Sequence, residues 1–104
     1  MKRLAYGCSE LLVADRTADL VLDYAVALIM QNTVDVVQLT AFLPNVAGAM
    51  EFRLLVGSEV PLVARESDDA RPDPDNRAVE LRMREQIAKL TAQPSYAWTT
   101  ADLL

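Results

Sequence analysis

Histidine is absent from this 104-residue sequence, and cysteine occurs once, at position 8. Without histidine, a single chain cannot build a Ser–His–Asp triad, a Cys–His dyad or a His-ligated zinc site. One cysteine allows neither an intramolecular disulfide nor a Cys-rich metal site. The commonest catalytic and metal-binding groups are therefore excluded, and the sequence predicts no catalytic residue, no cofactor and no metal site.

The remaining reactive or ligand-binding signals stand alone. Cys8 would need a cation or a helix N-terminus beside it to become a nucleophile, and Arg3 is the one cation close to it in the sequence. We therefore expect a buried or incidental thiol. Glycine is scarce, and Gly7, Gly48 and Gly57 are too far apart to form a phosphate-binding loop.

Long hydrophobic runs are also missing. The longest apolar run covers residues 24–30, whereas a membrane span needs about 18 apolar residues or more. The apolar stretch behind the basic start of the chain ends at Gly7, although a secretion signal needs about 7–15 apolar residues. We expect no membrane partner and a cytoplasmic location. Arginine outnumbers lysine 8 to 2, which indicates a GC-rich bacterial genome.

The hydrophobic periodicity predicts a single α+β domain over residues 1–94. We expect a two-layer fold with a small antiparallel sheet of three to four strands and two helices on one face, in the order β-α-β-β-β-α. The short connections after the first helix favour a three-strand meander. The expected elements are an extended segment at 10–14, a helix from a cap at Asp15 or Thr17 to Met30, strands at 34–43, 50–56 and 60–66, and a helix at 74–92.

Two segments carry more apolar surface than a chain of this length can cover. The first helix is apolar nearly all round after Asp23, which is typical of a helix covered on more than one side. Residues 95–104 form a tail that we expect to dock on its own domain or on a partner. The predicted partner is a second copy, in a homodimer. The candidate interface residues are Leu20, Tyr24, Ala27, Met30, Trp98, Leu103 and Leu104.

The acidic stretch at 65–78 has two interpretations. It contains four aspartates, Asp68, Asp69, Asp73 and Asp75, and Mg²⁺ and Ca²⁺ prefer such oxygen ligands. The spacing does not match an EF-hand loop from either starting aspartate. The alternative is a solvated connector followed by a helix start, with Asp73 as N-cap, Pro74 as the first helical residue and Asp75 in the first turn.

Three function classes follow, in this order of preference. The first is a small acidic, non-enzymatic interaction or assembly domain that acts as a homo-oligomer. The second is a small-ligand-binding or metal-assisted enzyme that uses Asp68–Asp75. The third is an RNA-binding domain, because the order helix, three strands, helix resembles that of double-stranded-RNA-binding domains. Their RNA-binding loops are basic, whereas the corresponding regions here are acidic and the net charge is −5. We therefore expect no nucleic-acid partner.

Overall fold

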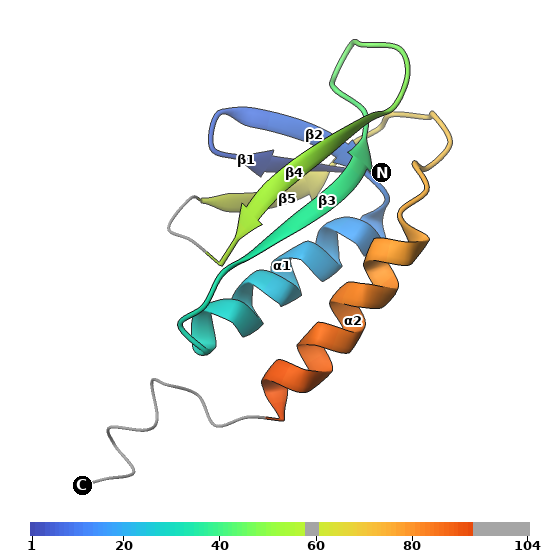
Figure 1. Ribbon diagram of the computed structural model, residues 1–104. Coiled ribbons are helices and arrows are strands. Elements are labelled where there is room, and N and C mark those ends of the chain that lie inside the picture. The colour runs from blue at the N-terminus through green and yellow to red at the C-terminus, as the bar shows by residue number, and fades with distance from the viewer. Residues whose placement is uncertain (58–60, 93–104) are drawn as a thin grey trace, which may run out of the picture.

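Five strands and two helices make up the computed structural model, which describes residues 1–57 and 61–92 (Figure 1). The α+β class and the β-α-β-β-β-α order are confirmed, with the first extended segment folded into two strands. The elements are β1 (Lys2–Tyr6), β2 (Ser9–Val13), α1 (Asp15–Met30), β3 (Asp35–Ala41), β4 (Met50–Val56), β5 (Leu62–Glu66) and α2 (Arg77–Thr91).

The N-terminal hairpin corrects the expected start of the chain. The sequence predicted extended structure only at 10–14, because Gly7 and Ser9 were interpreted as breaks. Instead β1 pairs with β2 in antiparallel register from Lys2↔Val13 to Tyr6↔Ser9. Gly7 has a φ of 59° and stands first in the two-residue turn, a position that favours glycine in tight hairpins.

The strands form two small antiparallel sheets, with order β2-β1-β5 in one and β3-β4 in the other. The sheets join where Leu12 and Phe42 exchange two backbone hydrogen bonds of 2.7 and 3.0 Å. The expected meander is right for the β3–β4 hairpin and wrong for the third strand. β5 follows β4 in the chain but pairs with β1, from Lys2↔Glu66 to Tyr6↔Leu62.

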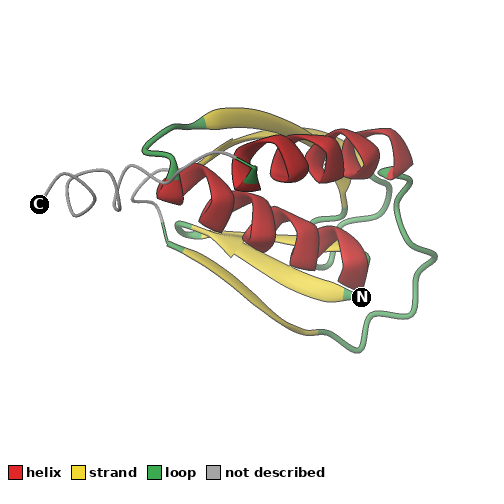
Figure 2. Cartoon of the chain, turned by 90° about the horizontal axis from the view of Figure 1, so that it is seen from below, coloured by secondary structure: helices red, strands yellow, loops and turns green. Residues whose placement is uncertain are grey.

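The two helices pack side by side and cover one face of the strands (Figure 2). α1 starts at Asp15, one residue before the earliest start that the expected caps allow; its N-cap is Ala14 and no side chain caps it. The predicted cap at Asp15 or Thr17 is therefore wrong. Neither of the two helices in the described part of the chain has the length and hydrophobicity that crossing a membrane requires.

The core lies between α1 and the inner faces of both sheets. Its members come from β1 to β4 and from both helices, and Met83 is the apolar residue of α2 that is fully buried in it. Alternation along β3 and β4 places Val37, Leu39 and Leu54 inside and leaves Gln38 and Arg53 outside. The core thereby fixes the face of α1 that stays exposed.

Candidate functional site

The connector after β5 holds its aspartates against arginines. Both carboxylate oxygens of Asp69 accept hydrogen bonds from the Arg71 guanidinium, at 2.9 to 3.2 Å. These hydrogen bonds hold the pKa of Asp69 below its ordinary value. Arg71 also donates to the Val46 carbonyl at 2.6 Å and stacks 4.2 Å from the Phe42 ring centre. The connector is thus tied to the 42–46 loop.

The other aspartates of this stretch do not point toward a common site where they could bind one metal ion. Asp75 accepts from the backbone and the guanidinium of Arg77, both at 3.1 Å, and the Arg77 hydrogen bonds lower its pKa. Asp73 lies 4.0 Å from the Arg16 guanidinium, and Asp68 is exposed. Within residues 1–57 and 61–92, no three acidic or cysteine side chains are grouped so that they could hold a metal ion. The metal-assisted alternative gains no support from this arrangement.

The predicted start of the second helix is also wrong. α2 begins at Arg77, its N-cap is Asn76, and no side chain caps it. The Asn76 carboxamide instead accepts from the Thr40 amide at 2.8 Å and donates to the Thr40 carbonyl at 2.7 Å. This pairing satisfies two backbone groups of β3 and fixes where the helix can start. Asp73, the expected cap, is exposed and makes no such bond.

Two polar clusters join α2 to the rest of the fold. The buried Glu80 carboxylate accepts from the Thr17 hydroxyl at 2.5 Å and from Arg16 Nε at 3.2 Å. In the second cluster, Asp35 Oδ2 at the start of β3 accepts from the Tyr24 hydroxyl on α1 and from Arg82 on α2, each at 2.6 Å. No side-chain polar atom buried in the described part of the chain lacks a partner. These groups therefore serve to hold the helices together.

The Tyr24–Asp35–Arg82 cluster shifts two pKa values. Burial, together with the hydrogen bond to the Asp35 carboxylate, raises the pKa of Tyr24 to about 12. Burial alone would raise the pKa of Asp35, but the hydrogen bonds from Tyr24 and Arg82 outweigh it and lower that pKa. Both shifts stabilise a neutral phenol that donates to a charged carboxylate, so neither group is prepared for proton transfer at neutral pH.

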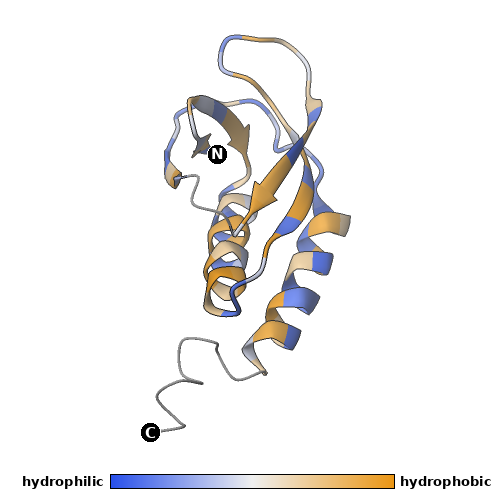
Figure 3. Cartoon of the chain, turned by 60° about the vertical axis from the view of Figure 1, so that its left-hand side comes forward, coloured by the Kyte–Doolittle hydropathy of each residue, from blue (hydrophilic) through white to orange (hydrophobic). Residues whose placement is uncertain are grey.

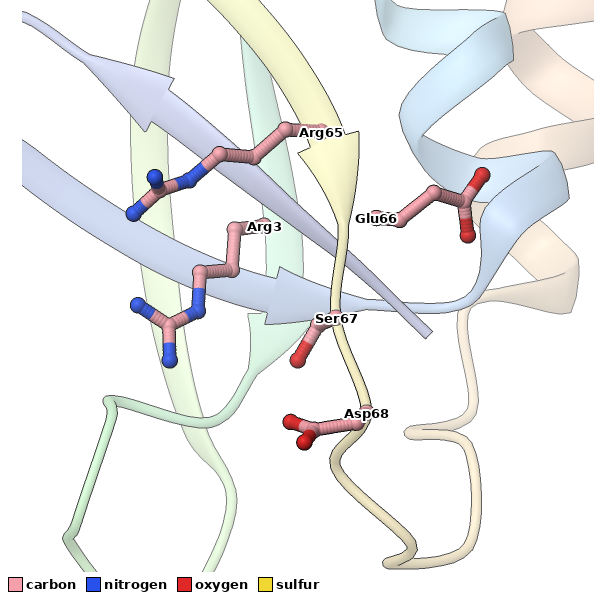
Figure 4. A pocket seen from close by; sticks show the side chains of 5 residues that line it. All are labelled: Arg3, Arg65, Glu66, Ser67 and Asp68. Atoms are coloured by element: carbon pink, nitrogen blue, oxygen red, sulfur yellow. The ribbon is translucent and has the colours of Figure 1, made fainter.

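A shallow polar pocket lies at the β1–β5 edge (Figure 4). Arg3 and Arg65 are paired across the ladder, and their side chains lie on the same side in Figure 4, while Glu66 points the other way. Glu10 accepts from Arg3 at 3.2 Å and from Arg65 at 3.1 Å. An anion would have to displace this carboxylate, so the arginine pair does not form a ready anion site.

The described surface also contains an apolar groove beside α1. Its volume is about 480 Å³. One wall is the stripe Leu22, Val26 and Ile29 on α1, and the strands contribute Leu55 and Leu62. None of the groove's described lining residues carries a charge. Val26 is 61% exposed and Ile29 is 56% exposed, so a large part of both aliphatic side chains faces solvent. Figure 3 shows hydrophobic residues along this C-terminal half of α1.

The candidate interface residues differ in how exposed the structure leaves them. Tyr24 and Ala27 are buried by the chain's own core, so they cannot contact a partner. Leu20 is half-buried against that core, and Met30 is 39% exposed. Trp98, Leu103 and Leu104, as well as the rest of the expected tail, lie outside the described residues.

The apolar stripe that α1 exposes, Leu22, Val26 and Ile29, therefore lies on a different side of the helix from most of the predicted interface residues. The sequence showed that the helix is apolar nearly all round, but the interface residues it predicted on this helix include neither Val26 nor Ile29. Cys8 lies exposed in the turn between β1 and β2 with a free thiol, which excludes the buried alternative for this residue.

Comparisons with protein-family models, with curated proteins and with solved structures found no match to this chain.

Proposed function

We propose that this protein is a small, non-enzymatic interaction or assembly domain that acts as a cytoplasmic homodimer. The observation that carries the proposal is the groove beside α1, whose described lining residues are all uncharged, with Val26 and Ile29 exposed on its rim. Contiguous apolar surface that is hollowed and free of charge is typical of a site where another molecule binds. The cytoplasmic setting agrees with a single exposed cysteine that has no disulfide partner in the chain.

The energetics favour covering this surface. Complete burial of a valine, leucine or isoleucine side chain stabilises by about 1.5–3 kcal/mol, so covering side chains that are half exposed contributes roughly half of that each. A groove lined by several such residues can thus support a modest association. Charges that lie outside the groove, in a chain with net charge −5, favour solubility and oppose unspecific clustering.

A second copy is the partner that requires the fewest assumptions. In a two-fold dimer the same patch contacts itself, so an apolar patch automatically meets apolar chemistry. The described residues of the rim are aliphatic on both the helix and the strand side, which suits such self-packing. The proposal therefore needs no second protein.

Sedimentation velocity over a wide concentration range tests this proposal. We expect the natural chain to form a dimer and Ile29→Asp to remain a monomer at the same concentration. Leu81→Asp is the matched control, because Leu81 is also 56% exposed and helical but belongs to α2, away from the groove. The proposal fails if the natural chain stays monomeric, or if both substitutions change the dimer equally.

A further inference from the structure

We propose that residues 93–104 of one copy bind in the apolar groove of the second copy, so that the two chains exchange their C-terminal segments. This inference rests on the proposed homodimer and names the segment that fills its groove. The described residues that receive the segment are Leu22, Val26, Ile29, Leu55 and Leu62.

Residue 93 follows the end of α2, which lies beside the end of α1 that lines the groove. The side-chain amide of Gln31, just after α1, donates to the Leu90 carbonyl in the last turn of α2 at 3.1 Å. Residue 93 therefore follows a point that is fixed beside the C-terminal end of α1. Val26 and Ile29 belong to the last turns of the same helix. Twelve residues can span at most roughly 40 Å, which is enough to reach a groove at this end of either copy.

The chemistry of the segment matches that of the groove. Residues 93–104 contain Tyr96, the single tryptophan Trp98, Leu103 and Leu104, and one charged side chain, Asp102. The described groove residues are aliphatic and uncharged, so they offer an aromatic ring the apolar contacts it needs. Aromatic anchors in apolar pockets often contribute most of the binding energy at protein interfaces.

The concave shape of the groove also favours an additional segment that fills it in a dimer. Two identical concave surfaces that face each other across a two-fold axis leave their hollows empty, and each hollow here measures about 480 Å³. Stable interfaces are packed as densely as protein interiors. Large side chains from another segment would fill each groove, and residues 93–104 are an apolar segment of the chain that lies outside the described residues.

The position of the groove on α1 favours exchange over docking within one chain. Thr17, Tyr24 and Gln31 face α2 or its neighbours, whereas Leu22, Val26 and Ile29 form the groove wall. Because each helical residue advances about 100°, Tyr24 and Val26 point roughly 160° apart. A segment that leaves α2 would have to pass around the end of α1 to reach its own groove. In a two-fold pair joined at this end, the segment of each chain can instead cross to the partner's groove.

Trp98 provides a direct probe, because its fluorescence is the only tryptophan signal of the chain. We expect its emission to shift to shorter wavelength, and its quenching by acrylamide to fall, at the concentration where sedimentation shows the dimer forming. Trp98→Ala is expected to raise the dimer dissociation constant at least tenfold, while the neighbouring Thr99→Ala changes it less than twofold. Ile29→Asp is expected to leave Trp98 solvated at every concentration.

The outcomes distinguish the two proposals. A shielded Trp98 in the monomer means docking within one chain and overturns the exchange. A dimer whose Trp98 stays solvated, or whose dissociation constant is insensitive to Trp98→Ala, overturns the exchange but leaves the homodimer intact. A chain that never dimerises and has a solvated Trp98 overturns both.

Discussion

The side chain of Asn76 pairs with the backbone of Thr40 through two hydrogen bonds, accepting from its amide at 2.8 Å and donating to its carbonyl at 2.7 Å. Asn76 is 4% exposed, so water does not easily replace these bonds. A residue at the start of α2 thereby satisfies two backbone groups of β3, while the helix cap expected from Asp73 does not form.

Asn76→Ala tests the importance of this pairing. It leaves two backbone groups of Thr40 without their partner, and each buried unsatisfied group costs about 1–3 kcal/mol. We expect the free energy of unfolding, measured with urea, to fall by about 2–4 kcal/mol. Asp73→Ala is the control and is expected to change it by less than about 0.5 kcal/mol, as surface substitutions usually do. A larger effect at Asp73 than at Asn76 would restore the capping interpretation.

Tyr24 should be recognisable in an alkaline titration. Its pKa is raised to about 12, so one of the three tyrosines should ionise late, as long as the chain stays folded. A raised pKa favours the neutral phenol in the folded state. The associated stability is present below the unfolded value of 10.0 and is lost as the pH rises from there through about 12. Absorbance at alkaline pH should show a late tyrosine that is missing in Tyr24→Phe; an unchanged titration would contradict the assignment.

Glu80 distinguishes hydrogen bonding from charge at the helix interface. Glu80→Ala removes the acceptor of the buried Thr17 hydroxyl, and we expect a loss of about 1–3 kcal/mol in the free energy of unfolding. The loss stays below that of a fully buried ion pair because the Arg16 side chain is 55% exposed and remains hydrated. Glu80→Gln keeps an acceptor and should lose less. Equal losses for both substitutions in urea unfolding would show that the negative charge is essential.

The aspartates of the connector should not respond to metal ions. Asp69 and Asp75 are each paired with an arginine two residues away, so a cation would have to displace that arginine. We expect millimolar Mg²⁺ or Ca²⁺ to leave the melting temperature unchanged, both in the natural chain and in Asp69→Asn. A rise in the natural chain that Asp69→Asn or Asp75→Asn abolishes would instead support the metal-assisted alternative.

Local patterns were sufficient to predict most elements. The strand at 50–56 coincides with β4, and the first helix ends at Met30, where the sequence placed its end. Alternation and helical spacing depend on near neighbours, which the sequence displays directly. The hairpin turn at Gly7 was missed although the signal was present, since glycine in a two-residue connection marks a turn as well as a break.

Pairings between distant segments could not be predicted in the same way. β5 pairs with β1, about sixty residues earlier, and Asn76 reaches Thr40 across 36 positions. The hydrophobic periodicity around one residue of such a pair does not indicate which distant residue it will contact. The same limit applies to α1: its apolar character was evident, but only the packing of α2 and the sheets decides that Tyr24 is buried and Val26 exposed.

Gly57 and Gly48 form a pair that separates backbone strain from steric overlap. Both have a positive φ, of 92° and 84°, so alanine is strained at either position. A Cβ at Gly48 would meet no atom within 4 Å, whereas one at Gly57 would lie 2.6 Å from the Thr33 carbonyl oxygen and 2.8 Å from Leu28 Cβ.

Gly48→Ala should therefore cost only the backbone term, about 1–2 kcal/mol. In Gly57→Ala the new methyl group also overlaps the Thr33 backbone and the Leu28 side chain of α1. Overpacking of this kind typically costs about 1–3 kcal/mol more. Urea unfolding of the two variants measures the difference. Equal losses would mean that Gly57 can move away from Leu28 and Thr33 at little cost. The groove wall at Leu55 and Pro61 would then be adaptable, because Gly57 stands between these two residues in the chain.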